Sequence, residues 1–334
     1  MRCIFCSLDR SPSEEHVFPL AIGGTVTTDR VCEPCNSTLG SRVDAALSDF
    51  FPVRVRRAML NLAGNSGTVP ARHEMFLGKV KLVGQTADQA HVTFNKETGQ
   101  LDTRQLKHVA ETVTPDGQKM LQITLDERDK DQLPKIIARE RKRRGLPPLS
   151  EEQLASQTNN FTTTTVDHPL IQINQSISFA FLRHAMMKIA YELAFLWLGE
   201  LYLDDPVAAE LRTAICSPEL TSTDKIAGYV GVAEDCDAFK CWTPHEEHHL
   251  AYANVVAGNV MISVRVFDIY AACIVVSREA GRYFQSHAHD EKLRFLAIDA
   301  VSGKTVETSF GQETQRIATA MTAFQRLPPF WDPL

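Results

Sequence analysis

The amino-acid sequence predicts an α+β fold, with a small module over about residues 1–50 and a larger α+β region over residues 51–334. Two observations support this division. Four cysteines lie in two Cys-x2-Cys pairs within the first 36 residues. Beyond residue 50, short apolar runs typical of strands alternate with longer runs of helical spacing. A chain of 334 residues is long enough for two domains, or for one large domain with a small appendage.

The two cysteine pairs predict a structural zinc site. Cys3 and Cys6 form the first pair, and Cys32 and Cys35 form the second. Four thiolates can close one tetrahedral zinc site. A module of about 50 residues buries little core by itself, so a metal ion would stabilise its fold. A redox role is the alternative, but redox Cys-x2-Cys motifs occur singly beside a βαβ pattern.

Inside the module we expect a strand, a turn and a helix. Residues 17–22 are apolar and lead into two glycines at 23–24, which predicts a strand followed by a turn. After the second cysteine pair, Leu39, Val43 and Leu47 recur at i, i+4 and i+8. This spacing predicts a helix with one apolar face.

The larger region is predicted to mix helices and strands. We expect helices over 53–62, 131–144, 178–202 and 206–215. We expect strands over 75–83, 91–94, 119–125, 170–173, 251–256, 260–266, 269–276, 293–298 and 305–310. The helix over 178–202 has the clearest period, with apolar side chains at Phe181, Ala185, Ile189, Leu193 and Leu196.

Composition and charge limit the class of protein. With 35 basic and 41 acidic residues, the net charge of −6 creates no overall positive field for nucleic acid, so such a partner would need a local basic patch. Eight cysteines are too few for a disulfide scaffold, and no secretory leader is recognisable. The most apolar stretch, 179–203, contains Arg183, His184, Lys188 and Glu192, which a membrane span would rarely tolerate. We therefore expect a cytoplasmic protein with free thiols and no membrane association.

Three polar residues near the cysteine pairs point to hydrolytic chemistry. Glu15 and His16 are adjacent, and Asn36 directly follows the last cysteine. An imidazole can take a proton from an attacking water. Carboxylate and amide oxygens suit Mg²⁺, which would neutralise charge developing at a phosphate. Neighbouring side chains on a strand point to opposite faces, so joint action of Glu15 and His16 requires a bend or a metal at the strand edge. Asn36 could instead cap a helix that begins there.

The segments CIFC, EEHVFPLAIGG and VCEPCN together resemble the zinc-knuckle branch of the HNH endonucleases, whose shared unit is the ββα-metal fold. The resemblance covers about residues 1–50, roughly 15% of the chain. It implies that His16 is the general base and that Glu15 and Asn36 hold a catalytic Mg²⁺ or Mn²⁺. It also implies that the four cysteines hold a structural zinc ion.

Three positions depart from the pattern of this family. Glu15 stands where the family often has aspartate, which moves the carboxylate by one methylene. Thr27 stands where an asparagine is common, and Gly40 stands where some relatives carry a third metal-binding histidine. The site would then have fewer protein ligands and more water on the ion.

The resemblance leads us to expect a metal-dependent endonuclease that hydrolyses phosphodiester bonds in DNA, with RNA a less favoured substrate. Residues 51–334 would bind or select the substrate, and restriction or phage defence is suggested by analogy. One HNH centre hydrolyses one strand at a time, so double-strand cutting would need a homodimer or two successive nicks. A catalytically inactive, zinc-dependent nucleic-acid-binding module and a zinc protein that only docks a partner remain alternatives.

Two basic segments are candidates for contact with DNA. Residues 1–50 contain four basic and seven acidic residues, so the attraction must come from elsewhere. We expect it from two sets of side chains: Arg54, Arg56 and Arg57 in the first, and Lys135, Arg139, Arg141, Lys142, Arg143 and Arg144 in the second. The alternative for the second set is an ordinary solvated helix face.

A second group of potential metal ligands occurs late in the chain. Cys236, Cys241, His245, His248 and His249 lie within 14 residues. Their spacing matches no strong zinc pattern, so we expect a polar loop with two buried thiols. A second metal site there stays open as an alternative.

Overall fold

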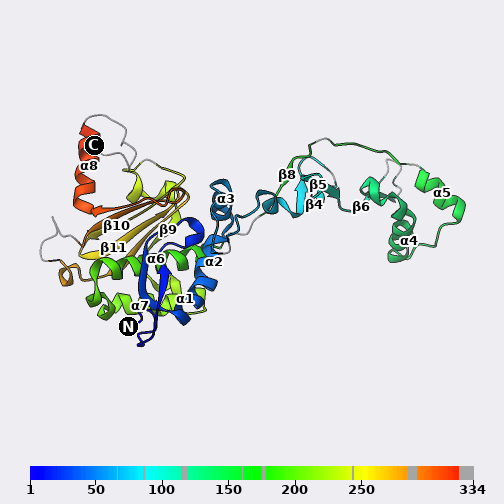
Figure 1. Cartoon of the computed structure of the whole chain (residues 1–334). Helices are drawn as coiled ribbons and strands as arrows, with labels where there is room; N and C mark the ends of the chain where they lie inside the picture. The colour runs from blue at the N-terminus through cyan, green and yellow to red at the C-terminus, as the bar shows by residue number, and fades with distance from the viewer. Residues whose placement is uncertain are drawn as a thin grey trace. The chain divides into compact units, whose positions relative to one another are not determined.

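The computed structural model of the chain comprises two compact units, Met1–Pro70 with Ser176–Leu334, and Ala71–Gln175 (Figure 1). The structure describes residues 1–322 except 66, 86, 114–116, 118, 160, 167, 175–177, 243 and 285–291. Both units contain helices and strands, and the strands that pair in the described residues are antiparallel. The predicted α+β class is therefore confirmed.

The N-terminal segment is a β-hairpin followed by a helix. β1 (Pro12–His16) pairs with β2 (Thr27–Cys32), and α1 (Glu33–Leu39) then contacts both strands. A π-helical turn, η2 (Gly40–Asp44), joins α1 to α2 (Ala45–Ser48). The predicted helical period is confirmed, because the side chains that it places on one face are buried: Leu39, Val43 and Leu47. Helix α3 (Phe51–Met59) follows, as predicted.

The predicted strand over 17–22 is wrong. The strand lies earlier, at β1, and residues 17–22 form a turn that ends in the 3-10 helix η1 (Leu20–Ile22). Val17, Phe18 and Ile22 are fully buried, so the apolar run reflects burial of a turn and not strand pairing. Gly23 has a φ of 85°, and a Cβ there would lie 2.4 Å from the carbonyl oxygen of Ala300. The turn therefore requires glycine at this position.

A six-stranded antiparallel sheet forms the centre of the larger unit, in the order β14-β13-β10-β11-β12-β9. Its strands are β9 (Gly228–Val232), β10 (His248–Val256), β11 (Asn259–Val266), β12 (Tyr270–Ser277), β13 (Arg294–Asp299) and β14 (Thr305–Ser309). All of these except β9 were predicted. Alternate side chains of the central strands enter two different hydrophobic clusters, which means that both faces of the sheet are covered.

Helices cover the two faces of this sheet. α6 (Phe179–Leu198) packs against β9, β11 and β12, and α7 (Pro206–Cys216) packs against β12 and α6 (Figure 1). The unpredicted helix α8 (Phe310–Thr322) contacts β10, β13 and β14. The predicted helices over 178–202 and 206–215 are confirmed. No helix in the described part of the chain is both long and apolar enough to cross a bilayer.

The predicted apolar face of α6 needs one correction. Its two ends, Phe181 and Leu196, are 43% and 37% exposed. The middle of the helix is instead buried nearly all round, including the charged residues Lys188 and Glu192. A single apolar stripe describes a helix that lies on a surface, whereas a helix enclosed on all sides shows no such stripe.

The N-terminal hairpin shares its hydrophobic core with the rest of the larger unit. Ile4, Phe18 and Val31 belong to the same buried cluster as Leu193 of α6 and Ile262 of β11. Residues on both sides of the boundary predicted at residue 50 therefore share one core. A separate role for residues 1–50 stays a prediction about function.

The smaller unit is built around a sheet in the order β5-β4-β3-β8 and a separate hairpin of β6 and β7. The strands are β3 (Gly78–Leu82), β4 (Gln89–Asn95), β5 (Gln100–Gln105), β6 (His108–Val113), β7 (Lys119–Thr124) and β8 (Ile171–Gln172). Its helices are α4 (Leu133–Arg143) and α5 (Glu151–Asn159). Strands β5 and β6 and helix α5 were not predicted.

Short 3-10 helices link these elements. They are η3 (Arg72–Phe76), η4 (Glu127–Gln132), η5 (Glu200–Asp204), η6 (Leu220–Lys225), η7 (Ala233–Asp235), η8 (Asp237–Phe239) and η9 (Ala280–Arg282).

Candidate functional site

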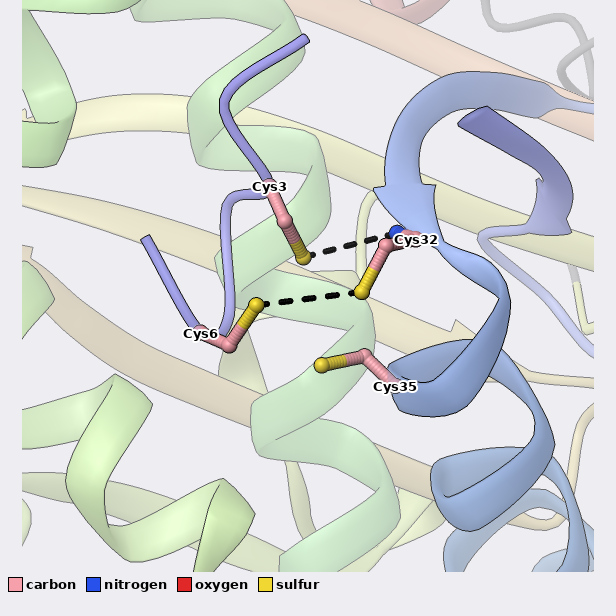
Figure 2. Close-up of side chains that lie close together, drawn as sticks. All are labelled: Cys3, Cys6, Cys32 and Cys35. Atoms are coloured by element: carbon pink, nitrogen blue, oxygen red, sulfur yellow. Dashed lines mark hydrogen bonds between the residues drawn. The ribbon is translucent and has the colours of Figure 1, made fainter. Parts of the chain in front are cut away.

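The four predicted zinc ligands lie together. The sulfur atoms of Cys3, Cys6, Cys32 and Cys35 are all within 4.8 Å of one another, and their side chains point toward a common centre (Figure 2). The Sγ atoms of Cys6 and Cys32 are 3.7 Å apart. Tetrahedral zinc with Zn–S bonds of about 2.3 Å requires sulfurs about 3.8 Å apart. The cluster therefore fits a structural zinc ion.

The surroundings of the cluster favour thiolate at one position. Burial tends to raise the pKa of Cys3, but backbone N–H groups, including those of Cys6 and Cys32, lower its pKa to about 7. Burial and the neighbouring Cys32 thiol raise the pKa of Cys35. Four sulfurs at this distance cannot all be ionised without a cation between them, which is the condition that zinc satisfies.

Helix α6 holds the first cysteine pair in place. The hydroxyl of Tyr191 donates a 2.6 Å hydrogen bond to the carbonyl oxygen of Ile4, between the two cysteines. The Tyr191 ring also packs on Phe5, with ring centroids 5.3 Å apart. The backbone N–H of Ile4 donates to the carbonyl oxygen of Arg30 in β2. The zinc site is therefore fixed both to its own hairpin and to the helix behind it.

Glu15 lies at a buried cluster of charges. Its side chain is only 2% exposed, and its Oε1 atom is 2.5 Å from Nζ of Lys188, which comes from α6. The same ammonium lies 3.1 Å from Oδ1 of Asp44 and 3.4 Å from Oε2 of Glu192. One fully buried cation thus faces three carboxylates.

Burial and charge act in opposite directions in this cluster. Burial lowers the pKa of Lys188, but Glu192, Asp44 and Glu15 outweigh it, and the pKa is raised. Burial raises the pKa of Asp44 to about 6, against the opposing charge of Lys188. Burial also raises the pKa of Glu192 well above its ordinary value. Lys188 therefore stays charged, whereas burial shifts Asp44 and Glu192 toward their protonated forms in spite of the neighbouring ammonium.

His16 ends β1 on the face opposite to Glu15. It pairs with Thr27 across the hairpin, and its side chain is half-buried. The pairing of β1 with β2 is irregular between Ser13 and Glu15. Such a bulge bends a strand and redirects the side chains that follow it. The irregularity lies before both site residues, since Glu15 and His16 pair in regular register with Thr28 and Thr27. Joint action of Glu15 and His16 would therefore depend on a metal ion at the edge of the strand.

Asn36 is not a helix cap. α1 begins at Glu33 with Cys32 as its N-cap residue, so Asn36 lies within the helix. Its Nδ2 atom instead donates to Oγ of Ser13, at 3.0 Å, and to the carbonyl oxygen of Glu14, at 2.7 Å. The amide therefore ties α1 to β1 and leaves Oδ1 as its remaining polar atom.

β1 and α1 carry oxygen atoms of the kind that a hard divalent cation binds. Oδ1 of Asn36 and the second oxygen of Glu15 are ligands that Mg²⁺ or Mn²⁺ accepts. A Cβ built on Gly40 would meet, beyond the helix backbone, only Asn36 Oδ1 at 3.9 Å, so space is open beside that oxygen. Glu15 and Asn36 could hold such an ion, which leaves His16 for the role of general base that the sequence predicts.

Two of the predicted DNA-contact arginines near α3 have structural partners. Arg56 forms ion pairs with Glu246, at 2.7 Å, and Asp268, at 2.9 Å. The guanidinium of Arg57 is buried and donates to the carbonyl oxygens of Ala21 and Ser48. Neither is available to a phosphate without breaking these contacts. Arg54 lies half-buried on the same helix.

The basic residues of α4 divide into two groups. Arg144 pairs with Glu111 and Glu140, and Arg141 donates to the carbonyl oxygen of Pro147. The other four are exposed and follow one another at i, i+4, i+7 and i+8 along one face: Lys135, Arg139, Lys142 and Arg143. We call these four side chains the α4 basic stripe.

The late group of cysteines and histidines is not assembled as a metal site. Cys236 faces Cys273, with their sulfurs 3.8 Å apart, and Cys241 is exposed. The rings of His245 and His248 stack, with centroids 3.8 Å apart. Among the described residues, the N-terminal cysteines are the group with the proximity that a metal ion needs.

The partners of Glu15 were not predicted from the sequence. Lys188 and Glu192 are four residues apart in the most apolar stretch of the chain, and Asp44 follows the second cysteine pair by nine residues. A charged side chain inside an apolar helix is normally buried together with a partner of opposite charge. The charges of Lys188 and Glu192 therefore already indicated a buried ion pair. The identity of those partners depends on the tertiary fold.

Comparison with known proteins supports the N-terminal assignment. Residues 3–52 match the family model of the HNH endonucleases. The match spans both cysteine pairs, β1, β2 and α1, and it confirms the predicted resemblance. No curated protein and no solved structure matches the chain.

Proposed function

We propose that the chain is a metal-dependent endonuclease of the HNH type that hydrolyses phosphodiester bonds in DNA. The observation that carries this proposal is the pair of hydrogen bonds from Asn36 to β1, which hold α1 against the strand that bears Glu15 and His16. The family match over residues 3–52 supports the same reaction class.

In the proposed reaction, His16 takes a proton from a water molecule. The water oxygen forms a bond to phosphorus, and one ester P–O bond breaks. Glu15 and Asn36 would hold Mg²⁺ or Mn²⁺, which supplies charge stabilisation at the phosphate and the leaving oxygen when bound. The four cysteines would hold a structural zinc ion, which would fix the hairpin and α1.

The α4 basic stripe is the surface that we propose for the DNA backbone. Its four side chains are exposed and make no ion pair among the contacts of the described residues, whereas Arg141 and Arg144 serve the fold. Lysine and arginine bind phosphates without reading sequence. Residues 51–334 would then bind or select the substrate. A role in restriction or phage defence is consistent with such a nuclease.

A second candidate function is a nucleic-acid-binding module without catalysis. The contact between Glu15 and Lys188 favours it, because the ammonium already supplies a cation to the proposed metal ligand. Against it stand the open space beside Asn36 Oδ1 and the half-exposed position of His16, neither of which a binding module needs.

Incubation of zinc-loaded protein with supercoiled plasmid and Mg²⁺ or Mn²⁺ distinguishes these functions. Nicked or linear product supports the endonuclease. Salt-dependent binding without cleavage of plasmid or modified phage DNA supports the binding module. Absence of affinity for DNA and for RNA would leave a protein that only docks a partner.

A further inference from the structure

Lys188 is the only basic residue that the described contacts bring to Glu15, and it comes from a different part of the chain. It lies on α6, is fully buried, and contacts Glu15 Oε1 at 2.5 Å. Its Nζ atom also lies 3.5 Å from the carbonyl oxygen of His16. One ammonium group therefore touches the side chain of one proposed site residue and the backbone of the next.

Two further carboxylates fix the position of this ammonium. Glu192 follows Lys188 by one turn of α6, and Asp44 ends the π-helical turn that follows α1. π-Helical turns are rare and occur often at functional sites, because the extra residue redirects the side chains around it. Here the turn precedes α2 and brings Asp44 to the same cation as Glu15.

Stability alone is a poor reason for this arrangement. Taking a lysine and three carboxylates out of water is costly, and well-packed apolar side chains at such positions are often at least as stable. A buried ion pair does, however, restrict the geometry of its members. A glutamate has three side-chain torsions, and contact with a fixed ammonium removes much of that freedom.

We propose that Lys188 is a positioning residue for hydrolysis, acting through Glu15. It holds the Glu15 carboxylate in one orientation, with Oε1 on the ammonium and the second oxygen left for the divalent ion, and it steadies the backbone at His16. Asp44 and Glu192 hold Lys188. This inference rests on the proposed function.

The test is a double-mutant cycle between Lys188 and Glu15, measured first by cleavage and then by Mn²⁺ binding. Lys188→Met, Glu15→Gln and the double variant are compared for cleavage at saturating Mn²⁺, well below their unfolding temperatures. We expect Lys188→Met to lose about 10²-fold in kcat, the usual effect of a misplaced reacting group. Because Lys188 acts through Glu15, adding Lys188→Met to the Glu15→Gln variant should lower its kcat almost no further.

Mn²⁺ binding gives a readout that is independent of turnover. Free Mn²⁺ is measured by electron paramagnetic resonance in the same four proteins. We expect Lys188→Met to shift the half-saturating Mn²⁺ concentration at least about threefold when Glu15 is present and not when Glu15 is Gln. Equal kcat values for Lys188→Met and the wild type, or additive losses in the cycle, would overturn the proposal.

A second variant keeps the test independent of folding. If Lys188→Met fails to fold, Lys188→Met with Glu192→Met removes the buried pair together, which is the change that buried ion pairs tolerate best. The same cycles with Glu15→Gln then apply. A wild-type protein that cuts no DNA would overturn the proposed function itself, whereas a cutting wild type with an unaffected Lys188 variant would overturn only the positioning role.

Discussion

The hydroxyl of Tyr191 lies 2.6 Å from the carbonyl oxygen of Ile4, and this hydrogen bond joins the longest described helix to the loop that carries Cys3 and Cys6. Both groups are buried. The zinc site is thereby built into the core of the larger unit and not appended to it. This relationship has a direct consequence for stability.

We expect Tyr191→Phe to lower the free energy of unfolding by about 1–2 kcal/mol, because it leaves the buried carbonyl of Ile4 without its donor. Zinc should also leave the protein faster under a chelator. Tyr202→Phe is the matched control, since the Tyr202 hydroxyl is buried with no hydrogen-bond partner in the described structure. Urea unfolding of both variants checks this, and equal losses would contradict the role of the bond.

Cys32→Ser should abolish zinc binding. Cys32 supplies a buried sulfur close to that of Cys6, and three remaining thiolates leave the tetrahedral site incomplete. We expect the zinc content, measured by elemental mass spectrometry, to fall from about one ion per chain to about zero. Cys216→Ser, which changes an exposed thiol, should keep about one ion. Full zinc content in Cys32→Ser would refute the four-cysteine site.

Stability should fall in mild acid because of His249. The ring of His249 is fully buried. Its Nε2 atom donates to the carbonyl oxygen of Ile22 at 2.8 Å, and its Nδ1 atom accepts from the backbone N–H of Phe267 at 3.1 Å. Burial lowers its pKa from about 6.5 to about 4. Below about pH 6.5, His249 is therefore protonated in the unfolded chain, whereas in the folded protein it stays neutral until the pH approaches 4. The stabilisation is complete above pH 6.5 and is lost as the pH falls toward 4.

Comparison of the wild type with His249→Gln between pH 7 and pH 4.5 isolates this effect. We expect the wild type to lose about 2.4 kcal/mol more than the variant over this range. The difference between the two proteins cancels the acid sensitivity of the zinc site, which both share. Parallel curves of unfolding free energy against pH would exclude the role of His249.

The α4 basic stripe should control the salt dependence of DNA binding. Replacing Lys135, Arg139, Lys142 and Arg143 by Gln should make the slope of log K against log salt concentration less steep by about 3–4, at about 0.9 for each phosphate contact. Arg141→Gln with Arg144→Gln is the control, because these side chains already bind Pro147 and two carboxylates. Fluorescence anisotropy measures both slopes. An unchanged slope in the fourfold variant would place the DNA elsewhere.

Most of the larger unit could be predicted because its signals are local. Leu39, Val43 and Leu47 show the helical period by themselves, and strands such as β11 and β12 are mostly apolar since both faces of their sheet are covered. The position of β1 could not be predicted in this way. Its sequence, PSEEH, is polar, and it becomes a strand only by pairing with β2.

The candidate site could be predicted in part for the same reason. The cysteine spacing specifies four ligands, and the structure brings their sulfurs together. The environment of Glu15 depends on Lys188, which is far away in sequence, so no local pattern describes it. Likewise, the charges of Arg56 and Arg57 suggested DNA contacts, but tertiary partners occupy both.

Plasmid cleavage by His16→Ala, compared with the wild type at equal zinc content, tests whether His16 is the general base. We expect the variant to bind zinc and DNA normally but to cleave about 10²–10⁴-fold more slowly with Mg²⁺ or Mn²⁺. His108→Ala, a change on β6 of the smaller unit, should cleave like the wild type. Undiminished cleavage by His16→Ala would contradict the assignment of His16 as general base, and with it the proposed active site.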